Sequence, residues 1–117
     1  MQLSEITFAT GRPVDGYGPN FFRVAGVVCE GNLAILPNSC GPWAGFEDPS
    51  PFVDAAKDLD VVFVGTGAQI GHIPLNFRAS LEGVGIGVEI MASPPACRTY
   101  NVLLSEGRRV GLALLPV

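Results

Sequence analysis

The stretch Val61-Val62-Phe63-Val64-Gly65-Thr66-Gly67 is the part of the chain that decides the fold. Its first four residues are apolar and three of them are β-branched, which favours a strand over a helix. Because none of the four is polar, both faces of this strand are predicted to be covered, as in the interior of a parallel sheet. Residues 60–65 therefore predict a central strand in a sheet that is covered on both faces.

The chain after residue 48 alternates between helical and strand patterns. In the segment 74–84, Phe77, Leu81 and Val84 recur at helical spacing and predict one buried helix face. The predicted helices cover residues 49–59, 74–84 and 94–106, and the predicted strands cover 60–65, 85–91 and 108–115. This order of strand, helix and strand predicts right-handed crossovers.

The first 48 residues predict β-structure and turns instead. Two apolar runs on either side of Glu30-Gly31-Asn32 indicate a hairpin, and Trp43 is expected to pack this hairpin onto the rest of the fold. The expected strands cover residues 6–9, 21–29 and 32–36, and a turn-rich stretch covers 11–20. The whole sequence predicts the α/β class: a three-layer β/α fold with a mixed central sheet and an N-terminal β-hairpin region.

The length and composition fit one domain, spanning residues 1–117, with a core that needs neither disulfides nor metal. Charged residues make up only 15% of the chain. Such a low share indicates a large core or a surface patch that meets a partner. The net charge of −4, with Arg108-Arg109 as the only adjacent bases, argues against a nucleic-acid-binding protein.

The three cysteines are Cys29, Cys40 and Cys97, and no two of them lie two or three residues apart. This spacing fits neither a zinc site nor a redox pair, so free thiols with no metal and no other cofactor are predicted. Free thiols indicate a reducing compartment. The segment Met1–Glu5 does not resemble a signal peptide, and no apolar stretch is long enough to span a bilayer. A cytoplasmic protein that does not span the membrane is expected.

The first candidate binding site is the loop formed by Gly65, Thr66 and Gly67, directly after the buried strand. Glycines at this place let backbone amides approach an anion. The next glycine is Gly71, however, so the spacing of a dinucleotide-binding loop is absent, and no phosphate-binding lysine follows. A tight turn under packing constraint is the favoured interpretation, and a ligand loop is the alternative.

The second candidate site is the helix that begins near Pro94. Ser93 is expected to cap this helix, and Arg98 and Asn101 share a polar face. This face is either ordinary solvated surface or a recognition surface. If the strands 60–65 and 85–91 are parallel neighbours, the glycine loop and the helix start border one crevice, where open α/β sheets commonly bind ligands.

No catalytic set emerges from the sequence. Cys97 lies near a helix N-terminus, which can lower a thiol pKa, but the only histidine, His72, is predicted in a separate loop. A buried, unreactive cysteine is the favoured interpretation. Glu89 lies within a strand, and Arg108 is its expected partner. No catalytic residue is assigned, and an enzyme is not expected.

The segment 17–23 combines aromatic residues with glycine and proline. It predicts a turn that feeds the hairpin and places its aromatic rings in the core. The alternative is an exposed aromatic patch for a protein partner.

An ordered set of short motifs also resembles one known family. It is a small bacterial and archaeal family of uncharacterised proteins, related to a mitochondrial assembly factor for respiratory complex I (NADH:ubiquinone oxidoreductase). The resemblance implies a three-layer β/α fold with a mixed central sheet and no established enzymatic activity. The motifs are Tyr17-Gly18-Pro19, Phe21-Phe22-Arg23, Leu36-Pro37, Trp43, Gly65-Thr66-Gly67 and the segments 85–91, 96–103 and 106–110.

Two functions from different classes follow. The first is a non-enzymatic assembly or protein-interaction factor with a protein partner, linked by the resemblance to respiratory-complex biogenesis. The alternative is a small-molecule or anion-binding module that uses the crevice between the Gly65–Gly67 loop and the Pro94 helix start. An apolar surface patch away from the crevice favours the first function, and a ligand in the crevice favours the second. A homo-oligomer is compatible with both.

Overall fold

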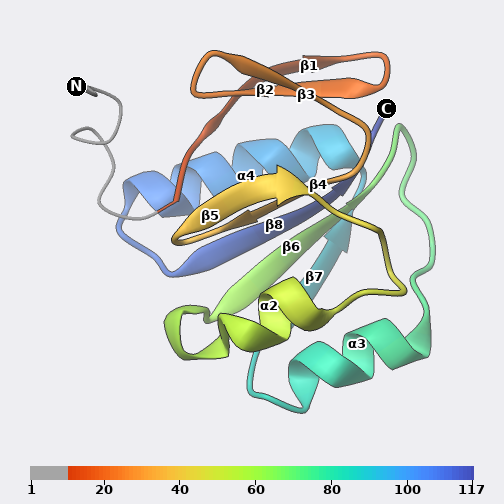
Figure 1. Cartoon of the computed structure of the whole chain (residues 1–117), viewed down its shortest axis with the longest axis vertical. Helices are drawn as coiled ribbons and strands as arrows, with labels where there is room; N and C mark the ends of the chain where they lie inside the picture. Colours follow the sequence, from red (N-terminus) through yellow and green to blue (C-terminus); the bar gives the residue numbers. More distant parts are fainter. Residues whose placement is uncertain (1–10) are drawn as a thin grey trace.

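The computed structural model describes residues 11–117, so the strand expected at residues 6–9 lies outside the described residues. Figure 1 shows two β-sheets with helices packed against the larger one. The strands are β1 (Val14–Gly18), β2 (Phe21–Val24), β3 (Val27–Glu30), β4 (Leu33–Leu36), β5 (Ser39–Pro42), β6 (Val61–Thr66), β7 (Gly87–Met91) and β8 (Val110–Leu115). The helices are α2 (Ser50–Asp54), the short 3-10 helix η1 (Ala56–Asp58), α3 (Leu75–Glu82) and α4 (Ser93–Ser105).

The larger sheet has five strands in the order β5-β4-β8-β6-β7. β6 runs parallel to both of its neighbours, whereas β4 runs antiparallel to β5 and β8. Val62 and Val64 are buried on one face of β6, and Phe63 is buried on the other. This arrangement confirms the predicted mixed central sheet and the prediction that β6 is apolar on both faces.

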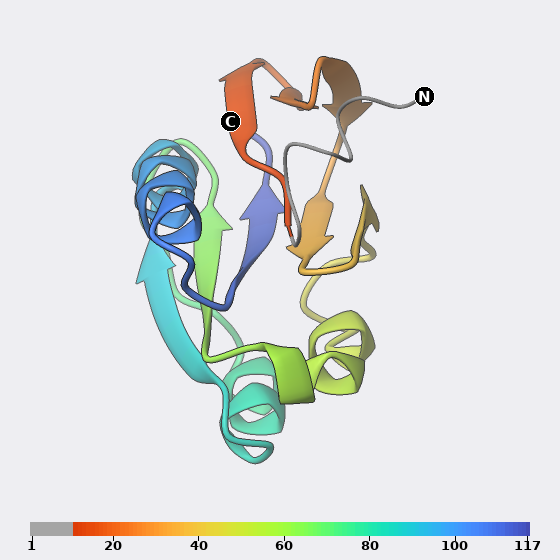
Figure 2. The same cartoon turned by 90° about the vertical axis from the view of Figure 1, so that its left-hand side faces the viewer.

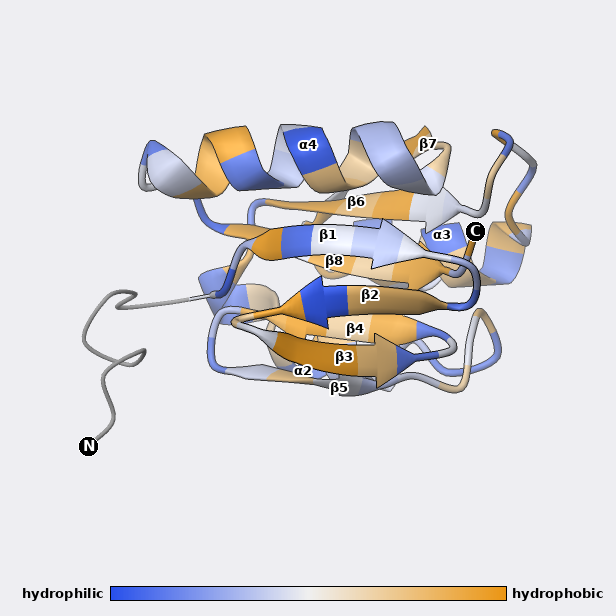
Figure 3. Cartoon of the chain, turned by 90° about the horizontal axis from the view of Figure 1, so that it is seen from above, coloured by the Kyte–Doolittle hydropathy of each residue, from blue (hydrophilic) through white to orange (hydrophobic). Residues whose placement is uncertain are grey.

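The five-stranded sheet is the middle layer of three. Seen from above, α4 and the three-stranded sheet β1-β2-β3 lie side by side over one of its faces (Figure 3). The helices α2 and α3 lie at the opposite end of the molecule, against the other face (Figure 2). Each face thus has its own core, which confirms the predicted three-layer fold.

The three-stranded sheet differs from the predicted hairpin. The stretch 21–29 is not one strand, because Ala25 and Gly26 adopt positive φ angles of 50° and 79° and turn the chain between β2 and β3. The stretch 32–36 forms β4, but β4 pairs with β5 and β8 rather than with β3. The turn predicted at 11–20 contains β1, which pairs with β2. The prediction failed here because alanine gives no sequence signal for a left-handed turn residue.

The predictions for the elements on the other face of the larger sheet agree better with the structure. The helix predicted at 49–59 is shorter, since α2 ends at Asp54 and η1 follows it. The helix predicted at 74–84 forms, but Val84 lies beyond its last turn and is 43% exposed. Trp43 lies in one core with Ala34 and Leu36, which belong to the second stretch of the expected hairpin, and its ring lies 5.6 Å from those of Phe52 and Phe77.

Candidate functional site

The predicted glycine loop and the start of α4 do lie together, in direct contact. The Gly67 amide donates a hydrogen bond to Ser93 Oγ at 2.8 Å, and the Ser93 amide donates one to the Gly67 carbonyl at 2.7 Å. A Cβ atom on Gly65 would lie 2.7 Å from the Ser93 Cα. Gly65 is therefore needed for the close approach of helix and strand, as the tight-turn interpretation predicted.

The backbone donors that an anion would need are used within the protein. The Gly67 amide binds Ser93 Oγ, and the Ser93 amide binds the Gly67 carbonyl. The next two helical residues, Pro94 and Pro95, have no N–H, and the Ala96 amide donates to Ala92. The helix begins after Ala92, so Ser93 is its first residue rather than its cap. The contact between loop and helix thus leaves none of these amides facing a ligand.

Ser93 forms the polar centre of this contact. It is fully buried, and its hydroxyl accepts from Gly67 and donates to the Leu115 carbonyl at 2.6 Å. One side chain therefore ties the ends of β6 and β8 to the start of α4.

Ser93→Ala is expected to destabilise the domain by about 2 kcal/mol, because a buried N–H and a buried carbonyl each lose their partner. Chemical denaturation of both proteins measures this difference. Ser105→Ala on the exposed end of the same helix is the matched control, since among residues 11–117 its hydroxyl bonds only to Val102 in its own helix. Equal losses for the two variants would contradict the role given to Ser93.

The two polar side chains predicted to face the crevice have different surroundings. Asn101 uses its side-chain amide to accept from the Val14 N–H and to donate to the Val14 carbonyl, both at 2.9 Å. This pair of bonds clamps β1 onto α4. Arg98 is exposed, and within residues 11–117 it makes no side-chain hydrogen bond or ion pair. The side chain of Asn101 is therefore used to hold β1 in place, whereas that of Arg98 is exposed on the same helix.

Thr66 fixes the loop that follows β6. Its hydroxyl lies 2.9 Å from the Gln69 carbonyl and accepts a hydrogen bond from the Gly71 amide at 2.8 Å. The connection between β6 and α3, seen as the long loop in Figure 1, is thus braced from within.

The structure offers no nucleophile with a neighbouring base among the described residues. Burial raises the pKa of the Cys97 thiol to about 12, opposite to the lowering considered for a helix N-terminus, and His72 is exposed on a loop. Glu89 is exposed and does not pair with Arg108; Arg109 instead pairs with Asp60 at 2.7 Å. Residues 11–117 contain no group of three side chains suited to a metal ion.

The surface also carries an apolar groove that the sequence analysis missed. It has a volume of about 540 Å³ and lies between the braced loop, the first turn of α3 and β7. Leu75 is 82% exposed and Ile70 is 66% exposed. The lining side chains are Ile70, His72, Ile73, Leu75, Arg78 and Ile90.

A signal for this groove was present in the sequence. Leu75 lies outside the spacing of Phe77 and Leu81 that marks the buried face of α3, and Ile70 stands in a loop. Apolar residues outside a predicted core stripe are candidates for exposed contacts. No helix within residues 11–117 is long and apolar enough to cross a membrane.

Comparison with known proteins places this geometry in a family. The model of a family described as a protein of unknown function (DUF498/DUF598) matches residues 14–115. An uncharacterised protein of Rhodobacter capsulatus is 48% identical over all of this chain and 94% of its own length. The NADH dehydrogenase [ubiquinone] 1 alpha subcomplex assembly factor 3 of Bos taurus is 33% identical over 88% of this chain, which spans 60% of that protein.

Solved structures of similar proteins have the same fold. A chain described as an outer membrane protein from Bartonella henselae has a TM-score of 0.83 and 31% identity, with 92% of this chain and 97% of that chain covered. A Bordetella parapertussis protein has a TM-score of 0.77 and 33% identity, with 92% of this chain and 98% of that chain covered. The chain described here therefore belongs to the DUF498/DUF598 family and is a relative of the animal assembly factors of NADH dehydrogenase.

Proposed function

We propose that this protein is a non-enzymatic interaction factor that assists the assembly of NADH dehydrogenase. Its docking surface is the groove that contains Ile70 and Leu75, hereafter the apolar groove. The observation that carries the proposal is the exposure of two large apolar side chains: Ile70, on a loop that is braced from within, and Leu75, in the first turn of α3.

The exposed side chains favour a protein partner. Burying one leucine or isoleucine contributes about 1.5–3 kcal/mol, so covering both contributes roughly 3 kcal/mol once their present partial burial is discounted. That free energy corresponds to a factor of more than about 100 in the dissociation constant. Because Thr66 holds the loop in place, little further ordering is needed when a partner binds.

The names of the relatives support one proposed partner. The animal relatives carry the name of an NADH dehydrogenase assembly factor, and this chain spans 60% to 66% of the Bos taurus and Danio rerio proteins. The similarity to these two proteins extends over 92% and 88% of this chain, a span long enough to include the apolar groove in its middle. We therefore assign as partner a subunit or an assembly intermediate of NADH dehydrogenase.

Leu75→Ser is expected to weaken partner binding about 30-fold, which corresponds to the loss of roughly 2 kcal/mol of apolar burial. The measurement is affinity capture from cells, with NADH dehydrogenase subunits quantified by mass spectrometry. Stability should change little, because Leu75 makes few contacts in the free protein and is 82% exposed.

Val102→Ser is the matched control for this experiment. Val102 is 55% exposed on α4, away from the apolar groove, and its replacement should leave capture unchanged. In a strain whose own gene is replaced, Leu75→Ser should lower the amount of assembled NADH dehydrogenase and Val102→Ser should not. Normal capture and normal assembly with Leu75→Ser would contradict the docking surface proposed here.

A further inference from the structure

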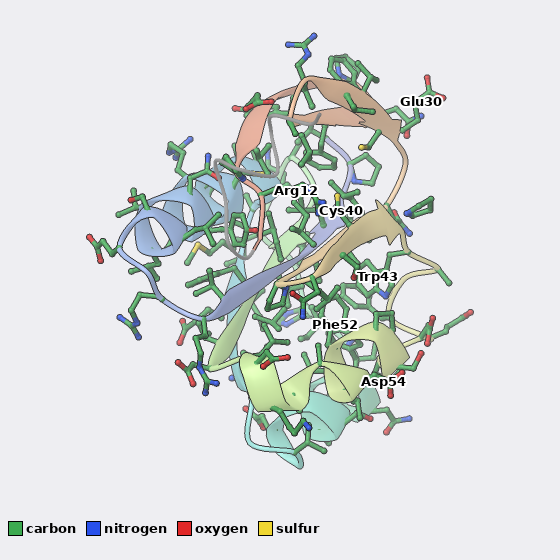
Figure 4. All side chains as sticks on the ribbon, turned by 60° about the vertical axis from the view of Figure 1, so that its left-hand side comes forward. Arg12, Glu30, Cys40, Trp43, Phe52 and Asp54 are labelled. Carbon is green, nitrogen blue, oxygen red and sulfur yellow. The ribbon has the colours of Figure 1, made fainter. Side chains whose placement is uncertain are left out.

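Two of the three cysteines meet at the border between the two sheets. Cys29 lies in β3, the outer strand of the three-stranded sheet, and Cys40 lies in β5, the outer strand of the larger sheet. β3 passes over β5 in the view from above (Figure 3). Figure 4 shows the Cys40 side chain in the space between β5 and the three-stranded sheet. Both side chains pack at the margin of the same core and are half-buried.

The Cys29 thiol is one of the groups that affect the pKa of the Cys40 thiol. The pKa of the Cys40 thiol is raised first by burial and then by the neighbouring Cys29 thiol, whereas the charge of Arg12 acts in the opposite direction. Cys97, in contrast, is 3% exposed within α4. The fold thus brings together two cysteines that the sequence spacing did not identify as a pair.

We propose that Cys29 and Cys40 form a dithiol site that low-molecular-weight disulfides, such as glutathione disulfide, oxidise to an intramolecular disulfide between the two sheets. The site is a position of covalent modification, and it is independent of the apolar groove and of any partner bound there.

The oxidation proceeds in two exchanges. The Cys29 thiolate attacks one sulfur of glutathione disulfide, which breaks the S–S bond, forms a mixed disulfide on Cys29 and releases one glutathione thiolate. The Cys40 thiolate then attacks the Cys29 sulfur and releases the second glutathione. The two protein thiols lose two electrons and two protons in total, and the two glutathione thiols carry them away.

We assign Cys29 as the attacking residue because Cys40 is the thiol whose pKa is raised by burial. The burial that raises the Cys40 pKa reduces its thiolate fraction, and only thiolates attack disulfides. Cys40 lies beside Cys29 and acts on the mixed disulfide once it has formed. The product joins β3 to β5 and closes the intervening chain, including all of β4, into a loop.

The experiment compares reduced protein before and after incubation with glutathione disulfide. The intact mass should fall by the mass of two hydrogen atoms, and thiol titration of the denatured product should find one of the three thiols. Peptide mapping should show Cys29 joined to Cys40. The melting temperature should rise by roughly 5–10 °C, because a loop of this size is closed in the unfolded chain.

Three variants and one condition make the result decisive. Cys97→Ala should oxidise like the wild type, whereas Cys29→Ser and Cys40→Ser should not form the disulfide. In urea, the glutathione disulfide needed for half-oxidation should be about tenfold higher, since only the folded sheets hold the thiols together. A stable mixed disulfide with glutathione, a bridge to Cys97, or equal oxidation in urea would each overturn the proposal.

Discussion

Val62→Asp is expected to abolish the folded state. Val62 is fully buried in β6, between the neighbouring strands β7 and β8 and against the core that contains Phe52 and Phe77. A carboxylate at this position has no partner, and burying it costs several kcal/mol. Small domains are stabilised by only about 5–15 kcal/mol in total, so the folded population should be lost or nearly lost.

Circular dichroism during heating measures this effect. The wild type should show a cooperative transition and Val62→Asp should show none. Val28→Asp is the matched control, because Val28 also lies in a strand but is 52% exposed, and its replacement should change stability by no more than about 0.5 kcal/mol. An unchanged melting temperature for Val62→Asp would show that β6 is not the covered strand described here.

Gly65→Ala is expected to have the second largest effect, a loss of about 3 kcal/mol. The added Cβ would lie 2.7 Å from the Ser93 Cα and 2.7 Å from a methyl carbon of Leu114. The leucine side chain can move, but the helix backbone at Ser93 can move only if α4 shifts away from β6. Such a shift would also strain the hydrogen bonds between Ser93 and Gly67.

Thermal unfolding of Gly65→Ala, with Gly41→Ala as the control, tests this expectation. Gly41 also lies in a strand, but a Cβ atom on it meets no atom within 4 Å. The melting temperature of Gly65→Ala should fall by roughly 10 °C, while that of Gly41→Ala should stay close to the wild type. If both variants matched the wild type, α4 would not be in close contact with β6.

The parts of the fold that the sequence predicted are those in which local pattern and tertiary structure agree. The apolar run Val61–Val64 predicted a strand that is covered on both faces. Helical spacing predicted the first and last residues of α3 and α4 to within a few positions. The predictions failed where the pairing of strands depends on residues that are far apart in the sequence. In sequence β4 looks like the return strand of a hairpin with β3, but it pairs with β5 and β8, with Ala34 opposite Ala113.

The candidate site was less predictable for a related reason. The contact of the glycine loop with the start of α4 was expected, but the donors at that contact depend on how Ser93 is placed after folding. Similarly, Asn101 carries an ordinary polar side chain whose partner, Val14, lies far away in sequence. The exposure of Leu75 and the meeting of Cys29 with Cys40 also depend on the folded backbone rather than on spacing along the chain.

The position of β8 has a consequence for the synthesis of the protein. β8 follows every other described strand in the sequence, yet it lies between β4 and β6 in the five-stranded sheet. Until the ribosome has released it, the β4-β5 pair and the β6-β7 pair have no strand to join them, and the apolar edges of both stay open. Sheets with open edges are prone to aggregate. The nascent chain therefore depends on the rapid insertion of β8 between the two pairs, or on a chaperone that covers these edges until β8 emerges.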